Sequence, residues 1–172
     1  AIVLADLRDL CAAELRSATN DYQRFYSAIH VFRDKYFSLP GDIPNAVKFC
    51  GAQAGSTADG VDNACAALTT AATGTLTCNG DGSGIISDDG PATTRDQFYE
   101  VSRAWQQLAN AGLIEGNYSG VSTARTMLPY VTNVNTPSSR IGKSAMWLIR
   151  GYVQRYEDAD WFKTEGNSFT LG

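Results

Sequence analysis

The chain has 172 residues, of which 44% are hydrophobic, and a formal net charge of −4. This is enough apolar material for one domain with its own core. The acidic balance argues against nucleic acid as the main ligand, because no basic excess is present to neutralise phosphates. No apolar run reaches the roughly 18 residues that a membrane-spanning helix needs.

The first 37 residues predict one long helix. Their apolar residues recur every three or four positions, which is the spacing of one helix face. These residues are Leu4, Leu7, Cys11, Leu15, Ala18, Tyr22, Phe25, Ile29, Phe32 and Tyr36. No glycine or proline interrupts the segment before Pro40 and Gly41. At about 1.5 Å per residue the helix would be roughly 55 Å long, whereas a compact chain of this size is about 40 Å across. We therefore expect the helix to overhang its own domain.

An overhanging apolar stripe has to be buried against something outside its own domain. We predict that its first half is an assembly interface with other copies or partners, and the alternative is a core helix in an elongated domain. The predicted interface residues are Leu4, Leu7, Cys11, Leu15 and Ala18.

Residues 51–77 are small and polar and show no helical or strand period, so we predict a long surface loop held by a disulfide. The four cysteines form no CxxC pair, which disfavours zinc. The many Ser, Thr, Asn and Gly residues in the middle of the chain favour an exported, oxidising environment. A Cys65–Cys78 bridge would close a poorly apolar loop of about 14 residues and stabilise the fold by about 3 kcal/mol. Cys11 lies about 39 Å along the helix from its end. Cys11 and Cys50 therefore have no assigned partner.

The segment CNGDGSGIISDDGP (78–91) has the alternating oxygen and glycine positions of a calcium loop. The candidate ligands within it are Asn79, Asp81, Ser83 and the Ile85 carbonyl. Gly90 stands where an EF-hand has its bidentate glutamate, which excludes an EF-hand. The missing carboxylate would come from Asp88, Asp89 or Glu100. The alternative is an ordinary cluster of Gly/Asp turns.

The remainder of the chain predicts one helix followed by strands. Thr94 to Gln97 fits a capping box, and the helix that follows would end at Gly112. Its expected buried residues are Phe98, Val101, Trp105 and Leu108. From Ile114 onward, four segments rich in aromatic and β-branched residues read as short antiparallel strands: IEGNYSG, MLPYVTNV, AMWLIRGYV and NSFTLG. Helices first and strands last predict an α+β fold.

Three segments in this order resemble the type IV pilin and type II secretion pseudopilin superfamily. They are FRDKYFSLPGDIPNA (32–46), CNGDGSG (78–84) and SRAWQQLANAGLIEGNYSG (102–120). The resemblance runs over most of Leu4 to Gly120, with a weaker match at GNSFTLG. It implies a pilin-like fold with an assembly helix (1–37) packed on a globular head (38–172). The head would hold the second helix, a variable loop (51–77) and a β-region (114–172) with a small C-terminal antiparallel β-sheet.

The resemblance also implies a function. The expected protein is a structural subunit of an extracellular type IV pilus-like filament or of a type II secretion pseudopilus. A hydrophobic helix start upstream of Ala1 would be cleaved from a prepilin leader and would contact the membrane before assembly. Its partners would be other copies in a helical homopolymer, other pilins and the inner-membrane assembly platform. Its location would be the bacterial cell surface or the periplasm.

The resemblance bears on the metal and on alternative functions as well. Relatives often pair a Gly/Asp loop with a carboxylate at the start of the next helix, a position that Glu100 holds here. Ca²⁺ is therefore the expected cofactor, with Asp88 as a further carboxylate. The alternative function is a minor or tip pilin that binds a surface or a ligand through 51–77. With one histidine, His30, and no G-x-S-x-G motif, no enzyme is expected.

Overall fold

The computed structural model describes residues 2–54, 71, 73–86, 99–121, 131–139, 147–152 and 166–171. Side chains are described for 12–54, 71, 73–86, 100–121 and 131–139. The elements are helices α1 (Ile2–Tyr36), α2 (Val47–Cys50) and α3 (Tyr99–Asn110), and strands β1 (Trp147–Tyr152) and β2 (Gly166–Leu171). Both long helices expected from the sequence are present, and α1 has no break. The helical part of the expected fold is therefore confirmed.

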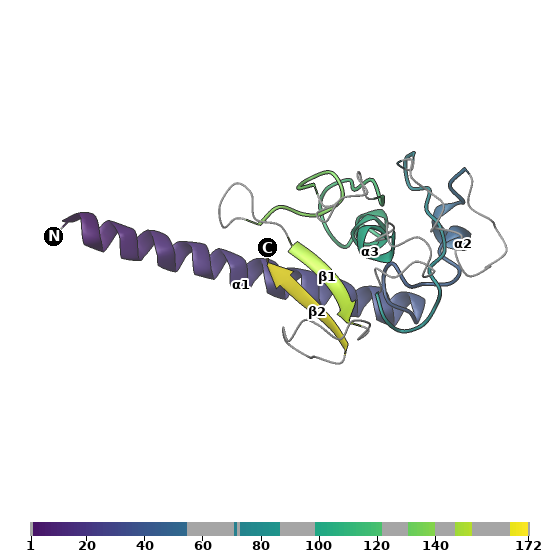
Figure 1. Cartoon of the computed structure of the whole chain (residues 1–172), viewed down its shortest axis with the longest axis horizontal. Helices are drawn as coiled ribbons and strands as arrows, with labels where there is room; N and C mark the ends of the chain where they lie inside the picture. Colours follow the sequence, from purple (N-terminus) through teal and green to yellow (C-terminus); the bar gives the residue numbers. More distant parts are fainter. Residues whose placement is uncertain are drawn as a thin grey trace, which may run out of the picture.

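The N-terminal part of α1 extends beyond the rest of the molecule (Figure 1). The helix has 35 residues, which corresponds to a length of about 52 Å. Among its described side chains, the first that packs against the core of its own chain is Ala18, which is partly buried, whereas Leu15 is 61% exposed. We call residues 2–17 the overhang. Of the five residues predicted to form the assembly interface, Ala18 alone is described as packing against this core.

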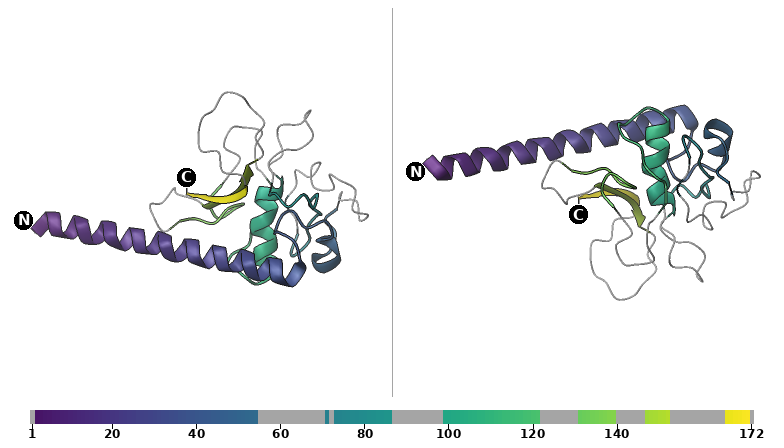
Figure 2. Two further views of the ribbon diagram at one scale, coloured as in Figure 1. Left: turned by 90° about the horizontal axis from the view of Figure 1, so that it is seen from below. Right: turned by 90° about the horizontal axis from the view of Figure 1, so that it is seen from above.

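The described core forms where α3 crosses α1 instead of running along it (Figure 2). The Phe25 and Trp105 rings meet edge to face there, with their centroids 5.0 Å apart. The other residues that these two helices place in the core are Ala28, Phe32, Val101, Ala104 and Leu108. The expected burial of Val101, Trp105 and Leu108 is therefore confirmed. Phe98 and the expected capping box at Thr94 to Gln97 lie outside the described residues.

A second row of aromatic residues on α1 is exposed to solvent. Tyr22, which the helical spacing placed on the apolar stripe, is 43% exposed, and Tyr26 is 48% exposed. Their rings stack with centroids 6.0 Å apart, and the Tyr26 ring lies 4.3 Å from that of His30. Because α3 crosses α1, it covers only a narrow band of the helix and leaves this neighbouring row uncovered.

Replacing Phe25 with alanine is expected to lower the free energy of unfolding by about 3–5 kcal/mol, the usual cost of truncating a buried phenylalanine. Phe25 is 1% exposed and contacts Trp105, which is fully buried. Denaturant unfolding of the two proteins would measure the difference. The matched control is Tyr26→Ala, which removes an aromatic ring from an exposed position and should cost less than about 1 kcal/mol. Equal losses in the two variants would contradict the assignment of the core.

The two strands pair antiparallel, with Trp147 opposite Leu171 and Tyr152 opposite Gly166. They lie on the same side of α1 as α3 (Figure 2). These strands correspond to the last two of the four segments expected to be strands. A larger antiparallel sheet in the head stays a prediction.

The prediction of a strand at IEGNYSG (114–120) is wrong, because the structure has no strand there. Gly116 and Gly120 have φ angles of +108° and +69°, which turn the chain away from an extended path. Tyr118 between them is buried, and its hydroxyl donates to the Glu115 carbonyl at 3.1 Å. The aromatic residue that suggested a strand therefore anchors a loop. Of the second expected strand, residues 131–134 belong to a turn with an isolated bridge from Thr132 to Thr136, and its first half lies outside the described residues.

Candidate metal centre

A sharp turn after α1 directs an aspartate into the head. Phe37 and Gly41 both have positive φ angles, +58° and +88°, so the chain reverses within a few residues. The Gly41 N–H donates to Oε1 of Gln107 at 2.7 Å, which fixes the turn to α3. Asp42 follows directly and is 1% exposed.

The Gly/Asp loop lies against this turn. The Gly80 N–H donates to the Ile43 carbonyl and the Gly82 N–H to the Asp42 carbonyl, both at 2.9 Å. A Cβ atom on Gly80 would overlap the Gly41 carbonyl and the Asp42 backbone. Glycine at position 80 therefore allows the two segments to come together.

Three carboxylates from three segments converge at this contact. Oxygen atoms of Asp42, Asp81 and Glu100 all lie within 4.8 Å of one another. Two ligands of one calcium ion, each about 2.3–2.6 Å from it, can be at most about 5 Å apart, so these oxygens are close enough to share an ion. Asp42 and Glu100 are buried, whereas Asp81 is exposed. Such a site has a protein side and an open side that water ligands can complete.

Backbone N–H groups orient the carboxylates. Asp42 accepts from the Ser83 N–H through Oδ1 at 2.8 Å and from the Gly84 N–H through Oδ2 at 2.9 Å. Asp81 Oδ1 also accepts from the Ser83 N–H, at 2.9 Å. The Asp81 N–H donates to Glu100 Oε1 at 3.1 Å. The loop thus connects the turn after α1 to the first turn of α3.

The pKa values of the two aspartates move in opposite directions. Burial, together with a hydrogen bond to the Asp81 side chain and the charge on that residue, raises the pKa of Asp42 to about 6. Burial alone would raise the pKa of Asp81, but hydrogen bonds from Ser83 and from the neighbouring carboxyls lower it on balance. One proton shared between close acids is the usual result of this arrangement, and a cation in its place would relieve the same repulsion.

Only some of the ligands predicted from the sequence lie at the carboxylate cluster. Asp81 and Glu100 come together as expected. Ser83 lies beside them, with its Oγ 3.5 Å from Asp42 Oδ1, and it donates to the Ile85 carbonyl at 3.2 Å. Asn79 Oδ1 instead accepts from the Val47 N–H at 3.1 Å, at the start of α2. Asp88 lies outside the described residues.

The sequence pattern does not indicate Asp42 as a ligand. The only local feature at this position is the Pro-Gly-Asp turn after the long helix, and its residues do not have the spacing of metal ligands. Its contacts with Ser83 and Gly84 join residues 41 and 42 positions apart in the sequence. Only the folded chain brings these residues together.

Removing the Asp42 charge is expected to flatten the pH dependence of stability in metal-free protein. Because the folded pKa is about 6 and the ordinary value is 3.8, folded Asp42 binds its proton at higher pH than unfolded Asp42 does. Its contribution therefore favours folding increasingly as the pH falls from about 7 to about 4. Denaturant unfolding in chelator at several pH values would measure this for wild type and Asp42→Asn. Parallel curves for the two proteins across that window would contradict the raised pKa.

The cysteines are partly accounted for. Cys78 is disulfide-bonded and Cys50 is a free thiol, whose pKa is raised by burial. Cys65 lies outside the described residues, as does the side chain of Cys11. The Cys65–Cys78 pairing therefore stays a prediction.

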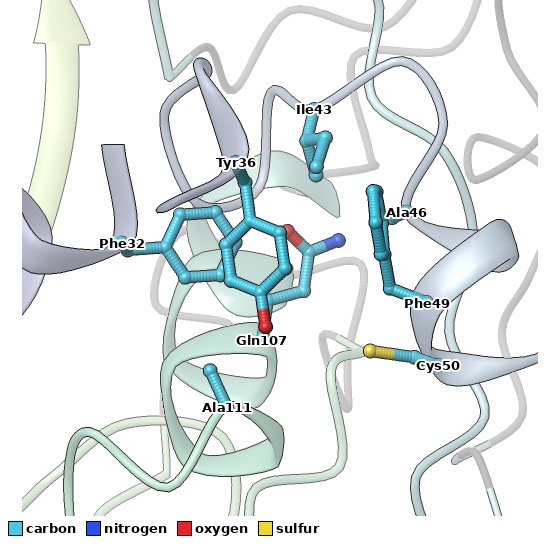
Figure 3. A pocket seen from close by; sticks show the side chains of 8 residues that line it. All are labelled: Phe32, Tyr36, Ile43, Ala46, Phe49, Cys50, Gln107 and Ala111. Carbon is cyan, nitrogen blue, oxygen red and sulfur yellow. The ribbon is translucent and has the colours of Figure 1, made fainter. Parts of the chain in front are cut away.

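A small apolar cavity between the three helices is too small for an organic ligand. Figure 3 shows Phe32 and Tyr36 of α1, Phe49 and Cys50 of α2 and Gln107 of α3 around it. Its volume is about 10 Å³, close to the minimum for a single water molecule. The Gln107 side chain is already bonded to Gly41 and Cys78.

Comparisons of the chain with protein-family models, with curated proteins and with solved structures find no match. Within the described residues, no helix combines the length and the apolar character needed to cross a membrane.

Proposed function

We propose that this chain is the structural subunit of an extracellular type IV pilus-like filament or of a type II secretion pseudopilus. The observation that carries the proposal is the overhang of α1. A helix that leaves its domain with an apolar residue such as Leu15 61% exposed gains nothing for its own fold. The same stripe gains burial when copies pack together. The pilin-like segments at 32–46, 78–84 and 102–120 favour the same function.

The proposed role of the metal is structural. Asp42, Asp81 and Glu100 would hold one Ca²⁺, because an all-oxygen donor set with an open side suits a hard cation with six to eight ligands. The ion would tie the turn after α1 to the loop at 78–86 and to the start of α3. The C-terminal end of α1 and the head would then move as one unit within a filament.

Electron microscopy tests the filament directly. The gene would be expressed in full in a bacterium that carries a filament assembly system. Sheared surface material and periplasmic extracts would be imaged with antibody against the head. Labelled filaments in either fraction are the expected result and would also identify the type of assembly. Protein found only as free monomer in both fractions would overturn the proposal.

A further inference from the structure

The C-terminal end of α1 and helix α2 lie at the end of the molecule opposite to the overhang (Figure 1). Residues 35–37 and 48–49 provide aromatic and basic side chains there, all of them exposed except Tyr36, which is half-buried. Phe37 is 91% exposed and Phe49 is 56% exposed. The Phe49 ring packs edge-on against Tyr36, with centroids 5.0 Å apart, and Lys35 Nζ lies 5.1 Å from the centre of the Tyr36 ring. Lys48 is also exposed. We call Lys35, Tyr36, Phe37, Lys48 and Phe49 the end patch.

Phe37 is unfavourable for the isolated chain in two ways. Its φ of +58° is a left-handed conformation that bulky side chains rarely adopt. The same conformation leaves nearly the whole ring in water. The left-handed conformation belongs to the turn after α1, but the exposure of the ring adds nothing to the stability of the single chain. An exposed aromatic ring is typical of a contact surface.

The overhang is complementary to the end patch in charge and in exposed apolar surface. Leu15 is exposed on it, and Glu14 is its neighbour in the chain. Among residues 2–17, three are acidic and two are basic, so the overhang is acidic by one charge. The end patch carries the two positive charges of Lys35 and Lys48.

We infer that the end patch of one copy receives the overhang of a second copy. The inference rests on the proposed function and names the contact through which the filament grows. The two surfaces differ and lie at opposite ends of the folded molecule, so the contact between two copies is heterologous. Repeating this contact without closing a ring gives an open filament. The exposed rings would cover the apolar side of the overhang, while the two lysines attract its acidic residues and set its orientation.

Phe37→Gly separates assembly from folding. Glycine takes the left-handed conformation freely, so the variant should unfold at the same temperature as wild type or at a higher one. The loss of the exposed ring should nevertheless lower filament yield, and head-to-tail association of purified protein in sedimentation, at least tenfold. Normal assembly by a folded Phe37→Gly variant would overturn the inference.

Charge reversal tests the orientation. Lys35→Glu combined with Lys48→Glu should reduce association at least tenfold, and adding Glu14→Lys should restore most of it. Glu115→Lys changes an exposed charge outside both surfaces and should leave association unchanged. Unchanged association in the patch variant, or no recovery in the combined variant, contradicts the docking.

The two readouts distinguish the inference from the proposed function. Filaments that tolerate every patch variant would keep the function and overturn the docking. Purified chain that associates through the end patch but forms no filament in cells would support the docking and overturn the proposed function. Purified chain that stays monomeric at all concentrations and salt levels overturns the docking in either case.

Discussion

Replacing Leu15 with aspartate is expected to abolish filaments while leaving the head as stable as in wild type. Leu15 is 61% exposed in the single chain, so a charge there costs little in folding. In a filament the same position would be buried, and an unpaired buried charge costs about 3–5 kcal/mol. This corresponds to subunit addition that is weakened more than about 100-fold. Filament mass in sheared material, together with thermal unfolding of the purified chain, would measure both effects.

The matched control places the same charge elsewhere on α1. Ser27 is also exposed and lies about 120° around the helix from Leu15, since each residue turns it by about 100°. Ser27→Asp should therefore affect assembly much less. Normal filaments from Leu15→Asp would show that the overhang is not an assembly interface. A head that unfolds in this variant would show instead that this part of α1 belongs to the core.

Calcium is expected to raise the unfolding temperature of the purified chain by about 5–10 °C at 10 mM. With a dissociation constant near 10⁻⁴ M, the ion would stabilise the folded state by about 2.7 kcal/mol, and each kcal/mol raises the midpoint by about 2–4 °C for a chain of this size. Asp81→Asn and Glu100→Gln should each abolish most of the rise, because each removes one of the three converging charges. Thermal unfolding in calcium and in chelator measures the effect.

An acidic residue outside the site provides the control. Asp34 is exposed and interacts only loosely with Arg33, at 3.9 Å. Asp34→Asn should keep the full response to calcium. Melting curves that coincide in calcium and chelator would remove the metal from the proposal, and residues 78–86 would then be a set of hydrogen-bonded turns. An equal response in magnesium would show that the site does not select the larger ion.

The helices could be predicted from the sequence because their signals are local. Apolar residues at every third or fourth position define one face, and this pattern predicted α1 and α3 and the burial of Phe25 and Trp105. The same pattern could not tell that Tyr22 stays exposed. That outcome depends on the direction in which α3 crosses α1, which no spacing within α1 records.

The candidate site could be predicted only in part, for the same reason. The alternation of glycine and oxygen-bearing residues indicated Asp81 and left Glu100 as one of three candidates for the missing carboxylate, and the resemblance then favoured Glu100. Asp42 is brought in by backbone bonds from Gly80 and Gly82 to the turn at 42–43, which no spacing within either segment encodes. The failed strand at 114–120 has a related cause, because its aromatic residue packs inward from a glycine-rich loop.

The separation of these segments along the chain has a consequence for kinetics. The bonds from Ser83 and Gly84 to Asp42 close loops of about 40 residues, and the bond from Gly41 to Gln107 closes a longer one. Because closing such loops costs entropy, we expect these contacts to form after the helices have docked and to be weak in the transition state. We therefore expect an ion held there to act as a latch: it should slow the opening of the head and leave the rate of its formation almost unchanged.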